Sequence, residues 1–372
     1  MAALDGASLR RHLVPITSTG PVHVNIDGRP VVLFSGNDYL GLSGHPAVKR
    51  AVSEAALAHG MGPRGSALIC GYTASHAALE AALAALEGAE AALLTPTGFA
   101  ANLSVLSALG GEDVAIFSDA LNHASIVDGC RLARRLGATV DVYRHGDVAD
   151  LASRLERCER PRRVIVTDSV FSMDGDLAPL DDLATLRERF GALLVVDEAH
   201  GTLVYGPSGA GVAEHLGVGD AVDLHVGTLS KAVGALGGFV AGSQRWRDWV
   251  MNRGRAQIYS TALPLPVVAG AHAALRVARA EPEHRARLWG HVARVSEALG
   301  QGGQSPIFSV VLGGAEEALT ASRALLQAGI HATAIRPPTV ADGTSRLRVT
   351  LSAAHADQDI DRLLAALASV GR

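Results

Sequence analysis

The residue of greatest chemical interest is Lys231, which lies in the small and apolar run "VGTLSKAVGALGG" at 226–238. Of the 33 lysines and arginines in the sequence, only Lys49 and Lys231 are lysines. A lysine at 231 suggests a task that arginine cannot perform, because an amine can lose its proton near neutral pH and act as a nucleophile or base. Burial in such a run would favour this role by lowering the pKa of the amine. The run alone leaves open a surface lysine whose stem packs on apolar residues.

The segment "VVDEAHG", residues 195–201, resembles a buried strand that ends in Asp197 and is followed by His200. A helicase-like magnesium site for ATP hydrolysis would also need a P-loop lysine followed by Ser or Thr. The two lysines of this sequence precede an arginine and an alanine, so an ATPase is excluded. Two interpretations remain, namely a carboxylate aimed into a ligand cleft and a solvated acid pair at a strand end.

Two further segments could bind a phosphate and an aromatic ring. "TPTGFAAN", residues 95–102, follows a predicted strand and opens a predicted helix, so the amides of Gly98 and Phe99 would lie at a helix N-terminus, where anions bind. "SDALNHASIVDG", residues 118–129, places His123 in a polar loop. Taken singly, these segments are equally compatible with an ordinary turn and a solvated histidine.

A basic strand is predicted at "SRLRVTLSA", residues 345–353. The alternation of a strand puts Arg346, Arg348 and Thr350 on one face. An arginine there could bind a carboxylate with two hydrogen bonds, or it could simply cover a sheet edge.

These separate signals are joined by the chemistry of pyridoxal 5'-phosphate (PLP). That cofactor needs a lysine for a Schiff base, an acid for its ring nitrogen, a helix N-terminus for its phosphate and a ring against its face. Lys231, Asp197, Gly98 with Phe99, and His123 supply these four groups. The coincidence is much stronger than any single motif.

The elements that must position these groups follow an alternating pattern from about residue 90 to residue 245. Short β-branched runs such as "RVIVTDSV" and "ALLVVDEAH" alternate with Ala/Leu/Arg-rich stretches of helical period. Because the runs are apolar almost throughout, they predict strands covered on both faces, in a mostly parallel sheet with helices on either side. The fold class is therefore α/β, and ligands should bind where strands end.

We expect three segments along the chain. Residues 1–44 form an N-terminal arm, residues 45–275 form the large domain that binds the cofactor, and residues 276–372 form a smaller α+β domain. The last segment has its own strand and helix pattern, including "PIFSVVL" and "DIDRLLAALASV".

Composition excludes several classes of protein. The net charge of -4 and the scattered arginines give no basic patch, which argues against nucleic-acid binding. No run of about 18 apolar residues and no signal peptide is visible, so no membrane association is expected. The three cysteines are odd in number and far apart, which fits a reducing cytoplasm.

With these motifs in place, the chain resembles the α-oxoamine synthases, fold-type-I PLP enzymes that condense an amino acid with an acyl thioester. The resemblance covers nearly the whole length. It includes the segments "SGNDYLGL", "CGYTASHAALE", "TPTGFAAN", "LNHASIVDG", "DSVFSMDGDLAPL", "VVDEAHGT", "TLSKAVGALGG", "YSTALPLP" and "AIRPPTVADGTSRLRVTLSAAH". It implies a large domain with a mostly parallel sheet and a smaller C-terminal domain.

The resemblance implies a catalytic role for four residues. Lys231 would form the Schiff base and later move the proton on the amino-acid Cα, and Asp197 would pair with the ring nitrogen. His123 would stack on the ring, and His200 would donate a hydrogen bond to its phenolic oxygen.

The resemblance also implies the remaining cofactor contacts. Thr228, together with the amides of Gly98 and Phe99, would hold the phosphate, and Ser172 matches a further cofactor-contacting position. A side-chain contact from Thr97 is less clearly implied, because serine is common there in the family. The family builds its site across a homodimer, so Ser260 or Thr261 would reach the phosphate of the other subunit.

For the substrates, the resemblance implies that Arg348 receives the amino-acid carboxylate with Asn37 nearby, that His123 also faces the substrate, and that Arg10 and Thr339 contact the acyl group. The stretch "AIRPPTV...GTSRLRVTLSAAH" is most similar to the biotin-pathway member of the family, which joins L-alanine to pimeloyl-CoA or to pimeloyl-acyl carrier protein. The alternative is a sibling enzyme that uses glycine with acetyl-CoA or succinyl-CoA. No metal is expected.

Overall fold

The computed structural model describes residues 6–301 and 303–370. The chain forms two compact units. The first contains the residues up to Gly44, Ser172–Asp176 and the residues from Glu281 onward, and the second contains His45–Phe171 and Leu177–Ala280. The division predicted from the sequence, into residues 1–44, 45–275 and 276–372, stays a prediction.

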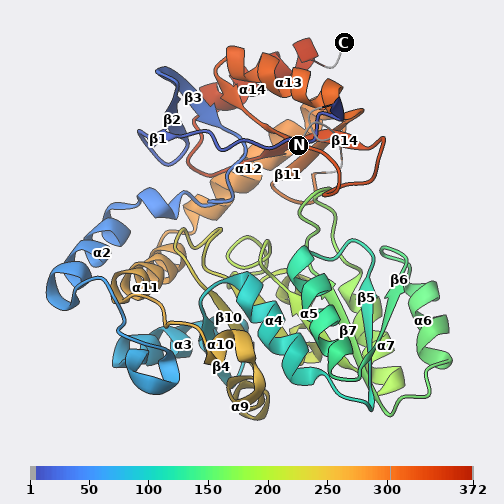
Figure 1. Ribbon diagram of the computed structural model, residues 1–372. Coiled ribbons are helices and arrows are strands. Elements are labelled where there is room, and N and C mark those ends of the chain that lie inside the picture. Colours follow the sequence, from blue (N-terminus) through green and yellow to red (C-terminus); the bar gives the residue numbers. More distant parts are fainter. Residues whose placement is uncertain (1–5, 302, 371–372) are drawn as a thin grey trace. The chain divides into compact units, whose positions relative to one another are not determined.

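The second unit is built on a seven-stranded sheet with the order β4-β10-β9-β8-β7-β5-β6 (Figure 1). Its strands are β4 (Ala91–Thr95), β5 (Val114–Asp119), β6 (Thr139–Tyr143), β7 (Arg162–Asp168), β8 (Leu193–Asp197), β9 (Leu224–Thr228) and β10 (Gly238–Gly242). Strand β10 runs antiparallel to β4 and β9, and the other pairs are parallel. The prediction of a mostly parallel sheet is confirmed.

Helices connect and cover these strands. They are α2 (Pro46–His59), α3 (Ala74–Glu87), α4 (Gly98–Leu109), α5 (Ala124–Arg135), α6 (Val148–Glu156), α7 (Leu180–Phe190), α8 (Val212–His215), α9 (Gln244–Arg253), α10 (Arg255–Ile258) and α11 (Leu265–Ala280), with short turns η2 (Ala67–Gly71) and η3 (Gly219–Ala221). Helix α4 contacts β9 and β10, helix α5 contacts β5 and β6, and the two helices pack on each other. The two helices that begin at the predicted phosphate and histidine motifs are therefore neighbours.

The sheet is buried because its strands are apolar on both faces. Val164 and Val166 of β7, Val195 of β8 and Leu224 of β9 are each at most 1% exposed and belong to one core cluster. Asp168 of β7, Asp197 of β8 and Thr228 of β9 stand at the carboxyl ends of their strands, where ligands bind in such sheets.

The first unit contains two small sheets and three long helices (Figure 1). Its elements are β1 (Thr17–Ser18), β2 (His23–Ile26), β3 (Arg29–Leu33), η1 (Leu42–Gly44), α12 (Glu283–Leu299), β11 (Ile307–Gly313), α13 (Ala315–Gln327), β12 (Ile330–His331), β13 (Thr333–Ile335), β14 (Ser345–Thr350) and α14 (Asp357–Val370). Strand β14, predicted from its alternating arginines, is the central strand of the order β11-β14-β13. The alternative that its arginines cover a sheet edge is therefore wrong.

Membrane-spanning helices are not found in the described parts of the chain, because no helix there is both long enough and apolar enough.

Candidate active site

Asp197 is the last residue of β8, and it lies beside Asp168, the last residue of the parallel strand β7. Its side chain is buried, with the residue 5% exposed. One carboxylate oxygen, Oδ1, accepts a hydrogen bond of 2.8 Å from the amide of Ala199, and Oδ2 accepts one of 2.6 Å from Nδ2 of Asn102. Two donors stabilise the ionised form of a buried carboxylate. The solvated acid pair, left open by the sequence, is therefore wrong for Asp197.

Lys231 follows β9, the strand next to β8, and is half-buried. Its charge acts on two other groups of the site: beside burial, the largest cause in both, it adds to the lowering of the pKa of His123 and opposes the raising of the pKa of Asp168. The half-buried position does not decide against a surface lysine whose stem packs on apolar residues, so the role of Lys231 stays a prediction.

His123 is the N-cap of α5, and its imidazole contacts both Ser125 and Phe99. Its Nδ1 lies 2.7 Å from Oγ of Ser125, and its ring meets the ring of Phe99 edge-on with centroids 6.2 Å apart. Although part of the side chain is exposed, burial is the largest cause that lowers its pKa, and Asp197 acts in the opposite sense. A neutral imidazole with an accessible ring suits packing against a planar ligand.

Asp168 is a further buried acid of this site. Its Oδ2 accepts a hydrogen bond of 2.6 Å from the backbone N–H of His123, and its own N–H donates to Oδ1 of Asn122. Burial, followed by the charge of Asp197, raises the pKa of Asp168 well above its usual value. Asp168 therefore holds the histidine loop against the end of the sheet.

The N-terminus of α4 is placed by a close contact with β9 and β10. Thr97 is the N-cap, and its hydroxyl accepts a hydrogen bond of 3.0 Å from the amide of Ala100. Gly98 lies so close to Thr228 that an added Cβ would be 3.0 Å from the Cβ of Thr228. The first amides of a helix lack partners inside it, so those of Gly98 and Phe99 form a suitable anion site.

His200 follows Asp197 in the same loop and is buried. Between them, Glu198 is completely buried and accepts hydrogen bonds from Ser169 Oγ and from the amides of Val212 and Ala213. Burial is the largest cause that raises the pKa of Glu198 to about 7. These contacts anchor the loop that carries Asp197 and His200.

Ser260 and Thr261 follow α10, and both line a small pocket together with Thr95 at the end of β4. Oγ of Ser260 donates to the carbonyl of Ala256 at 2.6 Å, and Thr261 pairs with Ser66 in an isolated antiparallel bridge. Among the described residues, neither side chain is hydrogen-bonded to Asp197, Lys231 or His123. The predicted contact of Ser260 or Thr261 with the phosphate of the other subunit therefore remains a proposal.

In the first unit, Arg348 is held by neutral oxygens. Both of its terminal nitrogens donate to Oδ1 of Asn37 at 3.2 Å, and its Nε donates to the carbonyl of Ser172. Its neighbour on β14, Arg346, instead pairs with the carboxylate of Asp174. Within residues 6–301 and 303–370, Arg348 is thus a buried cation, 7% exposed, without an ion pair.

The predicted acyl contacts also fall in the first unit. Arg10 and Thr339 are exposed, and Oγ1 of Thr339 accepts a hydrogen bond of 3.3 Å from Arg11. The structure therefore adds Arg11 as a partner of Thr339.

The groups of the second unit suit PLP by their chemistry. A half-buried amine, a buried carboxylate with two donors, a helix N-terminus and an accessible neutral imidazole come from neighbouring strand ends and from two helices in contact. These are the functions that PLP requires of its protein.

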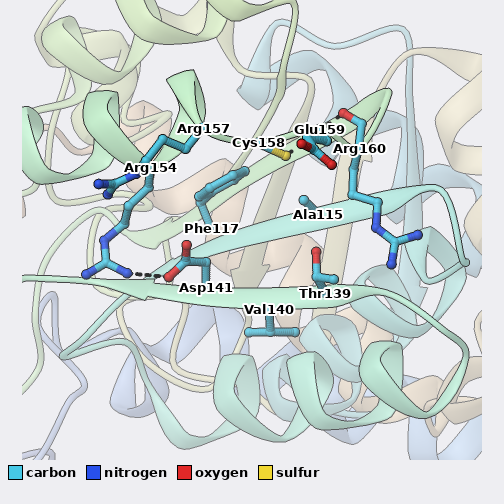
Figure 2. A pocket seen from close by; sticks show the side chains of 10 residues that line it. All are labelled: Ala115, Phe117, Thr139, Val140, Asp141, Arg154, Arg157, Cys158, Glu159 and Arg160. Atoms are coloured by element: carbon cyan, nitrogen blue, oxygen red, sulfur yellow. Dashed lines mark hydrogen bonds and ion pairs between the residues drawn. The ribbon is translucent and has the colours of Figure 1, made fainter.

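A separate pocket of about 380 Å³ lies at strands β5 and β6 (Figure 2). None of the predicted site residues lines it. Arg154 in this pocket pairs with Asp141, as the dashed line in Figure 2 shows. This pocket is distinct from the candidate active site.

Three residues of the candidate cofactor region were not predicted from the sequence, namely Asn102, Ser125 and Asp168. Asn102 and Ser125 stand inside the motifs "TPTGFAAN" and "LNHASIVDG". A usable signal was the helical spacing, because Asn102 lies four residues after Gly98 and so faces the same side of the helix.

The chain is similar to a known protein family and to solved structures. The family model of aminotransferase class I and II matches residues 29–367. A solved serine palmitoyltransferase that holds PLP is 34% identical, with a TM-score of 0.92, covering 96% of this chain and 92% of its own. The predicted fold-type-I architecture is confirmed.

Two curated relatives are more similar in sequence, and both are 8-amino-7-oxononanoate synthases. The protein of Arabidopsis thaliana is 52% identical over 92% of this chain and 75% of its own length. That of Anaeromyxobacter dehalogenans is 51% identical over 100% of this chain and 94% of its own length. The chain therefore belongs to the aminotransferase class I and II family and, within it, to the 8-amino-7-oxononanoate synthases.

Proposed function

We propose that this protein is a PLP-dependent acyltransferase that condenses L-alanine with a pimeloyl thioester and releases CO2 and the free thiol. The product would be 8-amino-7-oxononanoate, a precursor in biotin biosynthesis. The observation that carries the proposal is the identity of about one half, over the full length, to relatives named for that activity, and the charges of Lys231 and Asp197, which both act on His123, support it.

When bound, PLP supplies an electron-accepting ring that stabilises negative charge on the amino-acid Cα. Lys231 would hold the aldehyde covalently and move the proton on Cα. Asp197 would keep the ring nitrogen protonated, His123 would lie against the ring and His200 would hydrogen-bond the phenolic oxygen. The buried carboxylate of Asp197 accepts two hydrogen bonds that hold it in place, and this supports the assignment.

The phosphate would bind at the N-terminus of α4. The amides of Gly98 and Phe99 and the hydroxyl of Thr228 would donate to it, with Thr97 contributing as the N-cap. The close contact between Gly98 and Thr228 supports a shared site for one small anion.

The amino-acid carboxylate would bind Arg348, with Asn37 and Ser172 holding the guanidinium. A buried guanidinium is costly unless a negative charge neutralises it. Arg348 contacts only neutral acceptors among the described residues, whereas Arg346 already has a carboxylate partner. Arg10 and Thr339 would contact the acyl group.

The active enzyme would be a homodimer with a shared site, in which Ser260 or Thr261 contacts the phosphate in the other subunit. Thr261 pairs with Ser66, and the segment after Ser66 exposes large apolar side chains such as Ile69, which is 82% exposed. Tyr259, just before this pair, is 72% exposed. Exposed apolar groups gathered near one segment support an interface there.

The protein would act in the cytoplasm. Cys70, Cys130 and Cys158 are all unpaired, which supports a reducing compartment.

Thiol release by the PLP-loaded protein tests the proposal. The assay compares L-alanine plus pimeloyl-CoA, L-alanine plus pimeloyl-acyl carrier protein, and glycine plus acetyl-CoA or succinyl-CoA. We expect the highest kcat/KM with alanine and one of the pimeloyl thioesters, and we expect Lys231→Ala to abolish turnover and borohydride-trappable PLP.

A preference for a glycine pair would move the enzyme to the sibling activity and leave the site assignment intact. Borohydride-trapped PLP in Lys231→Ala would instead refute the assignment of Lys231. Lys49→Ala, which changes the other lysine of the chain, is the matched control.

A further inference from the structure

A chain of hydrogen bonds connects α4, α5 and the end of β8 behind the candidate cofactor site. Nδ2 of Asn102, in α4, donates to Oδ2 of Asp197 at 2.6 Å and to Oγ of Ser125, in α5, at 2.9 Å. Oγ of Ser125 lies 2.7 Å from Nδ1 of His123. Asn102 and Ser125 are each only 1% exposed.

The chemistry of these groups gives the chain one direction. The amide nitrogen of Asn102 has two hydrogens, and the acceptor carboxylate and the acceptor hydroxyl use both. Because Oγ of Ser125 already accepts a hydrogen bond, its own hydrogen is available for Nδ1 of His123. The backbone N–H of Ser125 also donates to Nδ1, at 3.2 Å. Nδ1 is therefore an acceptor, and the proton of neutral His123 is on Nε2.

The orientation of Asn102 is determined by the same contacts. A flipped amide would direct its oxygen at the carboxylate of Asp197, which is unfavourable because both are acceptors. In the orientation observed, Oδ1 of Asn102 is buried and lacks a hydrogen-bond partner among the residues that the structure describes. An unsatisfied buried acceptor is destabilising, so the amide serves its two donor contacts at a cost in folding free energy.

We infer that Asn102 is a positioning residue that holds the carboxylate of Asp197 directly and, through Ser125, holds His123 as the Nε2–H tautomer. This inference rests on the proposed function, because it assigns Asp197 and His123 to the PLP ring. Asn102 would thereby fix the positions of both Asp197, at the ring nitrogen, and His123, against the ring face.

The test uses four variants of the full-length protein. Asn102→Ala removes both donor contacts, and Ser125→Ala removes only the connection to His123. Ser125→Thr retains the hydroxyl and is the conservative rescue. Ser104→Ala is the matched control, because Ser104 is also buried in α4 and its hydroxyl has no hydrogen-bond partner among the described residues.

Three kinds of measurement are made on each variant. The visible absorption of the bound cofactor and its Kd report on the site, and kcat and KM are determined with the preferred substrate pair. Two-bond proton–nitrogen correlation spectra of 15N-histidine protein report the tautomer of His123 with and without PLP, with the signal assigned by His123→Gln.

We expect Asn102→Ala to lower kcat by about 10- to 100-fold, the factor that corresponds to one lost hydrogen bond to a charged group, with KM for the amino acid little changed. Its cofactor band should shift. Ser125→Ala should lower the fraction of the Nε2–H tautomer of His123, because only the backbone N–H of residue 125 then donates to Nδ1, and it should have a smaller effect on kcat. Ser125→Thr and Ser104→Ala should match the unmodified protein.

The inference would be overturned if Asn102→Ala kept the unmodified cofactor band and kcat. If that variant does not fold, the inference is overturned by a Ser125→Ala variant that keeps the cofactor band, the kcat and the His123 tautomer fractions of the unmodified protein. Failure of the proposed function is recognised separately, because the unmodified protein would then not bind PLP or release thiol.

Discussion

At the scale of single residues, the site depends on how the surroundings of each ionisable group set its protonation state. Asp197 is buried but receives two hydrogen bonds, whereas its neighbour Asp168 has a pKa raised well above the usual value by burial and by the charge of Asp197. Burial beside a second carboxylate thus favours the neutral form of Asp168.

Asp197→Asn should keep the fold and lower turnover by roughly 100-fold or more. An amide has no negative charge and so cannot keep a proton on the ring nitrogen. Its NH2 group would also face one of the two donors that bind Asp197, the N–H of Ala199 or Nδ2 of Asn102. Thiol release measures the turnover of Asp197→Asn, and circular dichroism shows whether its fold is kept.

Asp128→Asn is the matched control for that substitution. Asp128 pairs with Arg131 on the surface of α5, and exposed pairs contribute little to stability. Turnover of Asp197→Asn equal to that of Asp128→Asn would refute the assigned role of Asp197.

At the scale of elements, the proposed phosphate site depends on the approach of three strand ends to one helix. Gly238 at the start of β10 pairs with Thr95 at the end of β4 and with Thr228 at the end of β9. Because β10 is antiparallel to both, its start lies where they end, beside the N-terminus of α4. This arrangement requires a residue without a side chain at position 238.

Gly238→Ala should separate β10 from α4. Its Cβ would lie 2.5 Å from the backbone nitrogen of Gly98 and from the carbonyl carbon of Thr97, and neither backbone atom can rotate away. We expect the free energy of unfolding to fall by about 1 to 3 kcal/mol and PLP binding to weaken by about tenfold.

Denaturant unfolding and a PLP titration measure these two changes. Gly219→Ala is the control, because an added Cβ there meets nothing within 4 Å. If Gly238→Ala binds PLP as tightly as this control, the close contact does not shape the phosphate site.

At the scale of the whole molecule, buried histidines connect stability to pH. His355 packs its ring on Phe34, with centroids 4.1 Å apart. Its Nε2–H donates to the carbonyl of Leu33 at 2.8 Å, and its Nδ1 accepts from the amide of Ser352 at 3.0 Å. Burial is the largest cause that lowers the pKa of His355 to about 4.

The stability from neutral His355 should therefore be present at neutral pH and be lost as the pH falls from 6.5 towards 4, because the unfolded state binds the proton first. His355→Asn should be less stable than the unmodified protein at pH 7. The difference should shrink by about 1.4 kcal/mol for each pH unit in that window.

Unfolding free energies of the unmodified protein and of His355→Asn, measured at several pH values, test this prediction. Subtracting one from the other removes the opposite pH effect of acids such as Glu198, whose pKa is raised by burial, because both proteins contain them. His59→Asn, a change at an exposed histidine, is the control. A difference for His355→Asn that stays constant with pH would contradict the assignment of a neutral buried imidazole.

By itself, the sequence determined the α/β class, the mostly parallel sheet and the strand ends that hold Asp197 and Lys231. Periodicity and residue type are local properties, so a buried apolar strand ending in an acid can be recognised without coordinates. The resemblance of the motifs then indicated the PLP chemistry.

Only the tertiary structure decided which groups contact each other across the chain. Asn102, Ser125 and Asp197 come from three separate elements, and the hydrogen bonds between them depend on the packing of α4, α5 and β8. The central position of β14 and the different partners of Arg346 and Arg348 also depend on strand order. Such contacts are set by distances between remote residues, which spacing along the chain does not specify.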